Sequence, residues 1–362
     1  TFRPGETTSI FPCQLSANSI ANFQALGVSN PDCNNTGTTP VGLVIPGDPG
    51  VPRGLTQTYY KSFAPRIGFA WDPWKDGKTT VRGGFGIFYN PIEQLVLEQF
   101  QAEPPFGGSS LISEGLFNTP FISQSGDSSN LTISPNPFNG ILNPPRGSAV
   151  DWSAFRPILL FGELEPKLRS QYTEQYNFGI TRELSKDTVL SLSYVGSQGH
   201  RLLATHDINF GNAQTCIDLQ NLSDTYGDPN LSCGPFFADS PYTIPTTEGA
   251  LQTVAPAGGL HIPYGPNGPT VIPAGTPIAS VAPNGIQLVG LRRYSSPLCD
   301  PFSGTGCPVD GVPVFSSIFA QDTIAASNYN SLQASLEKRL SHGIQFEAAY
   351  TWSKSIDNAS SF

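Results

Sequence analysis

The chain has 362 residues, enough for one or two domains with a sizeable core, but only 38% of it is hydrophobic and 13% is charged. It contains 37 Gly and 34 Pro, so much of its length must be turn and loop. The 19 basic and 28 acidic residues give a net charge of −9 without a basic cluster, which argues against nucleic acid as a partner. No apolar run is long enough for a spanning helix, whereas a tilted spanning strand needs only about 9–11 residues. The chain has no Met and opens without a signal peptide, so we expect a fragment of a longer protein.

Residues 1–61 are predicted to form a loop-rich segment dominated by Pro, Gly, Asn and Thr. A first hairpin follows at about 62–90, where side-chain character alternates with the period of a strand. The segment PWKDG at 73–77 supplies its turn. The residues predicted to share its apolar face are Phe63, Ile67, Phe69, Trp71, Val81, Phe85, Ile87 and Tyr89.

The next connection, 91–171, is long and polar, and helical spacing in PIEQLVLEQFQAE predicts a short helix near its start. A second hairpin is predicted at 172–196, with a turn near 185–187. Residues 197–328 are again predicted to be loop. A third hairpin at about 329–354 turns at RLSHG. Its predicted apolar face contains Leu332, Ala334, Leu336, Leu340, Ile344, Phe346, Ala348, Tyr350 and Trp352.

Short turns therefore alternate with connections of roughly eighty and one hundred and thirty residues. Structureless connections of that length are uncommon in compact soluble domains, whereas outer-membrane barrels combine short periplasmic turns with long extracellular loops. The pattern predicts an all-β fold, a partial antiparallel transmembrane β-barrel over 62–362 that is incomplete without the rest of its chain. A secreted, disulfide-stapled β-sandwich that acts as an adhesin or binds a glycan remains the alternative. In that fold the apolar faces would bury one another.

Aromatic side chains lie near both ends of the predicted strands, where a lipid-facing band requires girdles. The general preference of Tyr and Trp for strands is the alternative explanation. The girdle candidates are Trp71, Trp74, Tyr89, Tyr172, Tyr176, Tyr194, Tyr350 and Trp352.

Several charged residues share the polar parity of the hairpins and are expected to face the lumen of a barrel. They are interpreted as a network that docks a plug or lines a path, or as solvated charge without a specific role. These residues are Arg66, Arg82, Glu337, Arg339 and Glu347. Lys338 instead has the apolar parity near a turn, where its amine is expected to reach the membrane interface.

A family resemblance is carried by three segments: FAPRIGFAWDPWKDGKTTVRGGFGIFYN, QYTEQYNFGITRELSKDTVLSLSYVGSQGHRLL and NYNSLQASLEKRLSHGIQFEAAYTWSKSIDNAS. They resemble the barrel of Oar-like TonB-dependent outer-membrane receptors over residues 60–362. The resemblance implies a barrel of roughly 22 strands, normally preceded by a carboxypeptidase-regulatory-like domain and a plug that contacts TonB. Neither the plug nor a TonB-contacting segment is recognisable in this chain. The partners implied are outer-membrane lipid, the TonB system through a plug, and an unidentified extracellular ligand that the loops capture.

The cysteines form three couples that are close in sequence and lie in predicted loops: Cys13 and Cys33, Cys216 and Cys233, Cys299 and Cys307. Six cysteines allow fifteen pairings, and nearest-neighbour disulfides would stabilise each loop by roughly 2–4 kcal/mol. Such bonds indicate an oxidising compartment, with free thiols as the alternative. No CxxC spacing occurs, so no metal site is expected.

Catalytic patterns are missing from the sequence. There is no GxSxG motif and no HExxH pair among His200, His206, His261 and His342. The glycine-rich segment 82–88 lacks the third glycine of a dinucleotide fingerprint and lies in a predicted strand. We therefore expect neither an enzyme nor a cofactor.

Overall fold

The computed structural model describes residues 1–54, 56, 58–91, 103–107, 122–124, 131–133, 142–164, 167–235 and 237–358. The predicted helix after residue 91 lies outside the described residues. The chain divides into two compact units. We call Thr1–Leu55, Leu95–Glu163 and Asp207–Ala320 the loop unit, and Thr56–Gln94, Leu164–His206 and Gln321–Phe362 the sheet unit.

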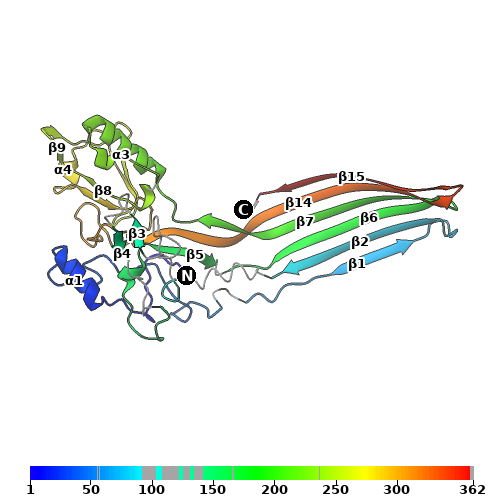
Figure 1. The fold of residues 1–362 in the computed structure, drawn as a ribbon, viewed down its shortest axis with the longest axis horizontal. Coiled ribbons are helices and arrows are strands. Elements are labelled where there is room, and N and C mark those ends of the chain that lie inside the picture. Colours follow the sequence, from blue (N-terminus) through cyan, green and yellow to red (C-terminus); the bar gives the residue numbers. More distant parts are fainter. Residues whose placement is uncertain are drawn as a thin grey trace. The chain divides into compact units, whose positions relative to one another are not determined.

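The main sheet follows the strand order β1, β2, β6, β7, β14, β15, and Figure 1 shows these strands side by side in one layer. Their bounds are β1 Arg66–Trp71, β2 Thr79–Asn90, β6 Gln171–Ser185, β7 Thr188–Asp207, β14 Phe315–Ser341 and β15 Ile344–Asp357. A further strand, β5 (Ile158–Leu164), pairs with β14 off this path. The three predicted hairpins are confirmed as the antiparallel pairs β1–β2, β6–β7 and β14–β15.

The sheet is open in the described part of the chain, because β1 and β15 lie at opposite ends of the path. The smallest spanning barrels have eight strands, more than this path contains. The sheet is therefore a sector of a barrel wall, which agrees with the predicted incomplete barrel.

The short turns form for local reasons. Between β14 and β15, His342 and Gly343 have φ values of 54° and 79° while Ser341 pairs with Ile344. Two consecutive residues with positive φ match the hairpin twist of a two-residue type I′ turn. Between β1 and β2, the Asp72 carboxylate accepts hydrogen bonds from the backbone N–H groups of Trp74, Lys75 and Gly77, at 3.3, 2.9 and 2.9 Å. This local acceptor holds the turn that the sequence PWKDG predicts.

Two strands extend beyond the predicted hairpins. β7 continues to Asp207 and β14 begins at Phe315, so parts of 197–328 that were expected to be loop are strand. In these extensions the side chains do not alternate between apolar and polar, and the period-two signal is therefore missing from the sequence.

The loop unit contains short elements joined by turns. Its helices are α1 Ala17–Ala25, η2 Trp152–Phe155, α3 Ala213–Tyr226, η3 Pro229–Leu231, η4 Phe237–Asp239 and α4 Ile278–Val281. Its short strands pair as β3 (Ile122–Gln124) with β4 (Leu131–Ile133), β8 (Pro241–Ile244) with β13 (Ile286–Val289), β9 (Thr247–Glu248) with β10 (Leu251–Gln252), and β11 (Leu260–Ile262) with β12 (Thr270–Ile272).

Buried side chains show that the long connections are folded. One core packs α3 residues Leu219 and Leu222 against Ile244, Ile278 and Ile286. A second core gathers Phe11, Trp152, Ile158 and Phe315 with Phe2, and the Trp152 indole N–H donates to the Phe11 carbonyl at 3.1 Å. A small third cluster joins Leu15, Phe23 and Cys33. The segments 1–61, 91–171 and 197–328 were predicted to be loop-rich, and their described parts contain these cores as well. Single apolar residues scattered among Gly and Pro form cores only in three dimensions, so the sequence pattern did not reveal them.

Candidate functional site

Cross-strand register joins the apolar faces of the three hairpins into one surface. Val81 lies opposite Ile180, and Ile180 lies opposite Leu192, so the first two hairpins share a face. The third is linked through Asn330, whose Oδ1 accepts hydrogen bonds from the Tyr194 and Tyr176 hydroxyls at 2.5 and 3.3 Å. Residues directly opposite each other point to the same side of a sheet. The apolar parity predicted for each hairpin is therefore continuous across six strands.

This apolar face is exposed. Trp352 and Phe178 retain 69% and 47% of their accessible surface, and large neighbours share this exposure. The exposed residues on this face include Ile67, Phe69, Trp71, Phe85, Phe178, Ile180, Leu192, Tyr194, Leu332, Ile344, Phe346, Tyr350, Trp352 and Ile356. A contiguous apolar surface of this extent requires an apolar environment. The β-sandwich alternative predicted the opposite, with these aromatics buried.

The opposite face carries mainly polar and small side chains. Arg66 lies opposite Gly86, and Arg82 lies opposite Ala70. The Arg66 guanidinium sits 4.5 Å from the centre of the Phe88 ring, an exposed cation–π contact. Arg66 and Arg82 both belong to the first hairpin, β1–β2.

The acidic candidates belong to the third hairpin. Glu337 and Glu347 face each other directly, a like-charge arrangement that costs free energy unless water or a partner separates the charges. Arg339 lies where the register shifts between Lys338 and Ser341, and its backbone N–H donates to the Asp187 carbonyl at 2.8 Å. Among the described residues, no ion pair joins these five charged candidates to one another.

The aromatic candidates fall into two groups along the strands. Trp71 ends β1 and Trp74 lies in the turn that follows. At the other ends of β2 and β6, Tyr89 faces Tyr172, and their ring centres are 5.6 Å apart. Tyr176 and Tyr194 stack at 6.1 Å. Tyr350 and Trp352 lie on the apolar face of β15, opposite Ala334 and Leu332.

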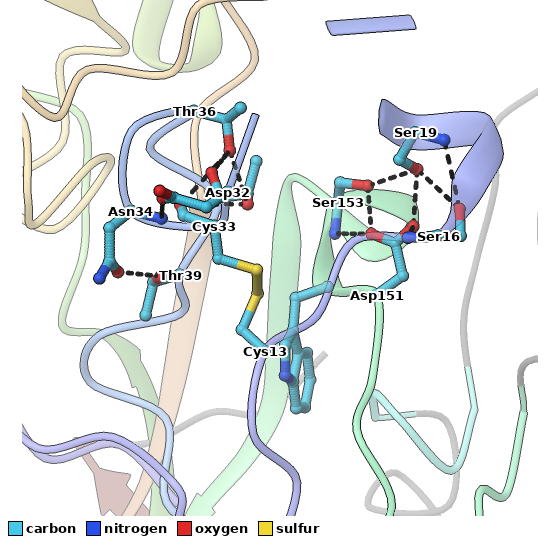
Figure 2. Close-up of a disulfide and its surroundings, with 12 residues drawn as sticks. Cys13, Ser16, Ser19, Asp32, Cys33, Asn34, Thr36, Thr39, Asp151 and Ser153 are labelled. Carbon is cyan, nitrogen blue, oxygen red and sulfur yellow. Dashed lines mark hydrogen bonds between the residues drawn. A yellow bond between two sulfur atoms is a disulfide. The ribbon is translucent and has the colours of Figure 1, made fainter. Parts of the chain in front are cut away.

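All three predicted disulfides are present, and all belong to the loop unit. Cys13–Cys33, Cys216–Cys233 and Cys299–Cys307 close loops with sequence separations of 20, 17 and 8 residues. Figure 2 shows the first bond beside the Asp32 turn, where the carboxylate of Asp32 accepts from the N–H groups of Asn34 and Asn35 at 2.8 Å. Loop closure removes entropy from the unfolded chain, so the bonds stabilise this unit.

A polar junction that the sequence did not reveal ties two distant segments of the loop unit. Asp151 accepts from the Ser16 N–H at 2.9 Å and the Ser19 hydroxyl at 2.6 Å, and from the Ser153 N–H at 3.1 Å (Figure 2). Burial alone would raise the pKa of Asp151, but hydrogen bonds from Ser153, Ser19 and Ser16 outweigh it and lower the pKa below its usual value. A lone Asp in a Pro- and Gly-rich stretch gives no sequence signal for this role.

A groove of about 390 Å³ opens in the loop unit. It is formed by the β11–β12 hairpin, the end of α4 and Phe302, whose loop is closed by Cys299–Cys307. The lining residues are Gly265, Pro266, Asn267, Gly268, Thr270, Val271, Ile272, Pro273, Val281 and Phe302, and none of them is charged. Its size is within the range of small-ligand pockets.

Charge is divided unevenly between the two units. The loop unit contains six Arg and no Lys against seventeen Asp and Glu, and the sheet unit contains thirteen basic and eleven acidic residues. The loop unit therefore carries most of the negative charge of the chain, and its field repels anions.

The described part of the chain contains no group of three or more His, Cys, Asp or Glu side chains placed to hold a metal ion. Within the same residues, no helix combines the length and apolarity needed to cross a bilayer.

Residues 10–362 match the family model described as an outer membrane beta barrel domain. Because the match covers nearly the whole chain and agrees with the open sheet and its exposed apolar face, the chain belongs to this family and to the bacterial outer membrane. Among solved structures, it is similar to the outer membrane transporter YddB from Escherichia coli, with 10% identity and a TM-score of 0.32. The similarity covers 81% of this chain and 20% of that transporter, so the chain spans a fifth of its length. The comparison with curated proteins gave no match.

Proposed function

We propose that this chain is part of a TonB-dependent outer-membrane receptor of the Oar-like type, which captures a ligand outside the cell and imports it through a plugged barrel. The observation that carries the proposal is the loop unit. The connections between hairpins, which leave the sheet at the ends opposite the short turns, form a disulfide-closed body with cores and a groove. A barrel that served only as a membrane anchor would not need long connections with their own cores, disulfides and groove.

In this proposal the apolar face contacts lipid and the polar face lines the lumen. From Ile344 to Trp352 the apolar residues of β15 cover about 27 Å along the strand, comparable with the roughly 25 Å apolar band of outer-membrane barrels. The short turns then face the periplasm, and the long connections begin and end at the extracellular ends of the strands.

The polar face suits a plug. Gly68 and Gly84 lie directly opposite each other, and Gly179 lies opposite Arg82. These small residues leave the backbone accessible, while Arg66, Arg82, Glu337, Arg339 and Glu347 offer charges to a plug surface or to passing ligand. The proposed mechanism has no covalent step, so we propose a transporter and not an enzyme.

Ligand capture is assigned to the loop unit. The groove beside Phe302 has no charged side chain in its lining, and the unit that surrounds it is strongly acidic. Both features favour a neutral or cationic ligand over an anionic one.

The proposal is tested by uptake in cells that carry the full-length receptor. Deletion of its gene and deletion of TonB should abolish accumulation of the same compounds from a panel of soluble peptides and oligosaccharides. Accumulation that depends on the receptor but persists without TonB would instead indicate a passive pore. If neither deletion changes uptake of any compound in the panel, the transport assignment for those compounds is wrong.

A further inference from the structure

Arg182 and Lys338 are cations on the apolar face of the sheet that lie close to the short turns. Arg182 shares its side with Ile180, because it lies opposite Leu190 of β7 and Thr79 of β2. Lys338 shares its side with Leu336 and lies opposite Phe346. On a surface that meets lipid, an unpaired cation is tolerated only near the headgroups.

Neither cation is neutralised within the part of the chain that the structure describes. Among the described residues, no carboxylate lies within ion-pair distance of Arg182 or Lys338. The Arg182 guanidinium lies 5.3 Å from the centre of the Trp74 ring, and one of its N–H groups donates to the Thr79 hydroxyl at 3.2 Å. These contacts orient the guanidinium but leave its charge without a counterion.

An apolar hollow adjoins the two cations. It measures about 200 Å³, and its lining residues are Leu190, Ala334, Ser335, Leu336, Ala348, Ala349 and Tyr350. Leu190 is the cross-strand partner of Arg182, and Leu336 precedes Lys338 by two residues on the same side. Ala334 and Ala348 are small residues between larger ones, and this difference in size makes the hollow.

We propose that this surface binds one glycerophospholipid, whose phosphate lies between Arg182 and Lys338 and whose acyl chain fills the hollow. The strands that carry the two cations are separated by β7 alone, which places them about 10 Å apart across the sheet. Both side chains are long enough to reach a single phosphate from that separation. Trp74 fits the same position, because its amphipathic ring is stable where acyl chains meet headgroups.

The proposal rests on the apolar face meeting lipid and not on transport. It also commits to a lipid phosphate over free phosphate, because the hollow contains no cation of its own and is lined mainly by apolar side chains that suit an acyl chain. With the short turns on the periplasmic side, the site belongs to the inner leaflet.

The test is native mass spectrometry of the full-length protein in a mild detergent, titrated with dioleoylphosphatidylglycerol and with dioleoylglycerol, which has the same acyl chains without the phosphate. Each cation near the surface contributes a factor of about five to binding of an anionic lipid, so Arg182→Gln or Lys338→Gln should weaken phosphatidylglycerol binding about five-fold and the double variant about thirty-fold. Ala334→Leu fills the hollow and should weaken binding of both lipids without a change of charge.

Lys354→Gln is the matched control, because Lys354 lies opposite Asn330 on the same face but far from the short turns. It should leave binding unchanged. An equal loss in Lys354→Gln would overturn the site in favour of general charge attraction, and equal binding of the two lipids would overturn phosphate recognition. Displacement by inorganic phosphate alone, or preferential binding of lipid A, would assign the site to another source of phosphate. Heat-modifiable mobility of each variant confirms that it is folded.

Discussion

At the scale of single residues, Asp151 illustrates how one carboxylate can fix an irregular segment. It accepts hydrogen bonds from the first turn of α1 and from the start of η2, segments separated by more than a hundred residues in sequence. Its hydrogen bonds replace the regular pairing that Pro and Gly prevent in this part of the chain. Asp151 is therefore expected to control local stability of the loop unit.

Asp151→Asn should destabilise this junction by about 1–3 kcal/mol, because an amide nitrogen would face backbone N–H donors that now meet a carboxylate oxygen. Hydrogen exchange of Ala17–Ala25 and Trp152–Phe155 measures the effect in the full chain. Asp224→Asn serves as the control, since Asp224 is exposed and accepts only from the Gln220 side chain in the contacts described. Equal exchange in wild type and Asp151→Asn would contradict the assigned role.

The lowered pKa of Asp151 gives this contribution a defined pH dependence. A carboxylate whose folded pKa is depressed stabilises the folded state fully above its unfolded pKa, about 3.9, and loses that stabilisation as the pH falls through the folded pKa. The difference in protection between wild type and Asp151→Asn should therefore be present at pH 7 and shrink below about pH 4. A difference that stays constant to pH 2 would show that the charge is irrelevant.

Residues differ in how far their roles can be predicted from sequence. The three cysteine couples were predictable because cross-linked residues close in sequence need little chain to meet. Trp152 and Asp151 were not, because their partners Phe11 and Ser16 lie far away in sequence and no local pattern marks them.

At the scale of elements, sequence-based prediction succeeds for the hairpins and fails for the connections. Both outcomes depend on whether a local sequence pattern marks the strands. In β14 and β15 the alternation of Leu332, Ala334 and Leu336 with polar residues predicts both the strand and its face. In β8 and β13 the strands have four residues each and are separated by some forty residues, so neither alternation nor a turn signal identifies the pair. Sequence reasoning therefore predicted the membrane sheet and missed the fold of the loop unit.

The disulfides make the loop unit sensitive to reduction in a way that the sheet is not. Replacing Cys216 and Cys233 with Ala should lower the free energy of local unfolding of α3 by about 3 kcal/mol, the loop-entropy value for a closed loop of this length. Hydrogen exchange of the α3 amides measures this free energy of local unfolding. Strand β6 in the sheet unit is the internal reference, and its exchange should not change. Unchanged exchange in α3, or equal loss in β6, would contradict this separation.

At the scale of the whole molecule, the chain distributes its chemistry between two units. The sheet unit presents an exposed apolar face and a polar face, and the loop unit concentrates acidic residues, disulfides and the groove. This division agrees with an outer-membrane barrel, whose wall must match lipid while its long connections meet solvent. The family assignment agrees with the wall, whereas the proposed ligand capture rests on the loop unit.

Substitutions at two adjacent alanines test most directly which face of the sheet meets lipid and which meets the lumen. Ala348 lies opposite Leu336 on the apolar face, and Ala349 lies opposite Ser335 on the polar face, near the middle of β15. If the apolar face meets lipid, Ala348→Arg should cost about 2–4 kcal/mol of folding free energy in the bilayer, because the guanidinium would lie near the midplane. Ala349→Arg, which makes the same substitution one residue later, should be nearly neutral in a hydrated lumen. Urea unfolding of the full-length protein in vesicles, monitored by its heat-modifiable mobility, measures the folding free energy of both variants. Equal costs would mean that both faces meet the same medium, and a larger cost for Ala349→Arg would reverse the assignment of lipid and lumen.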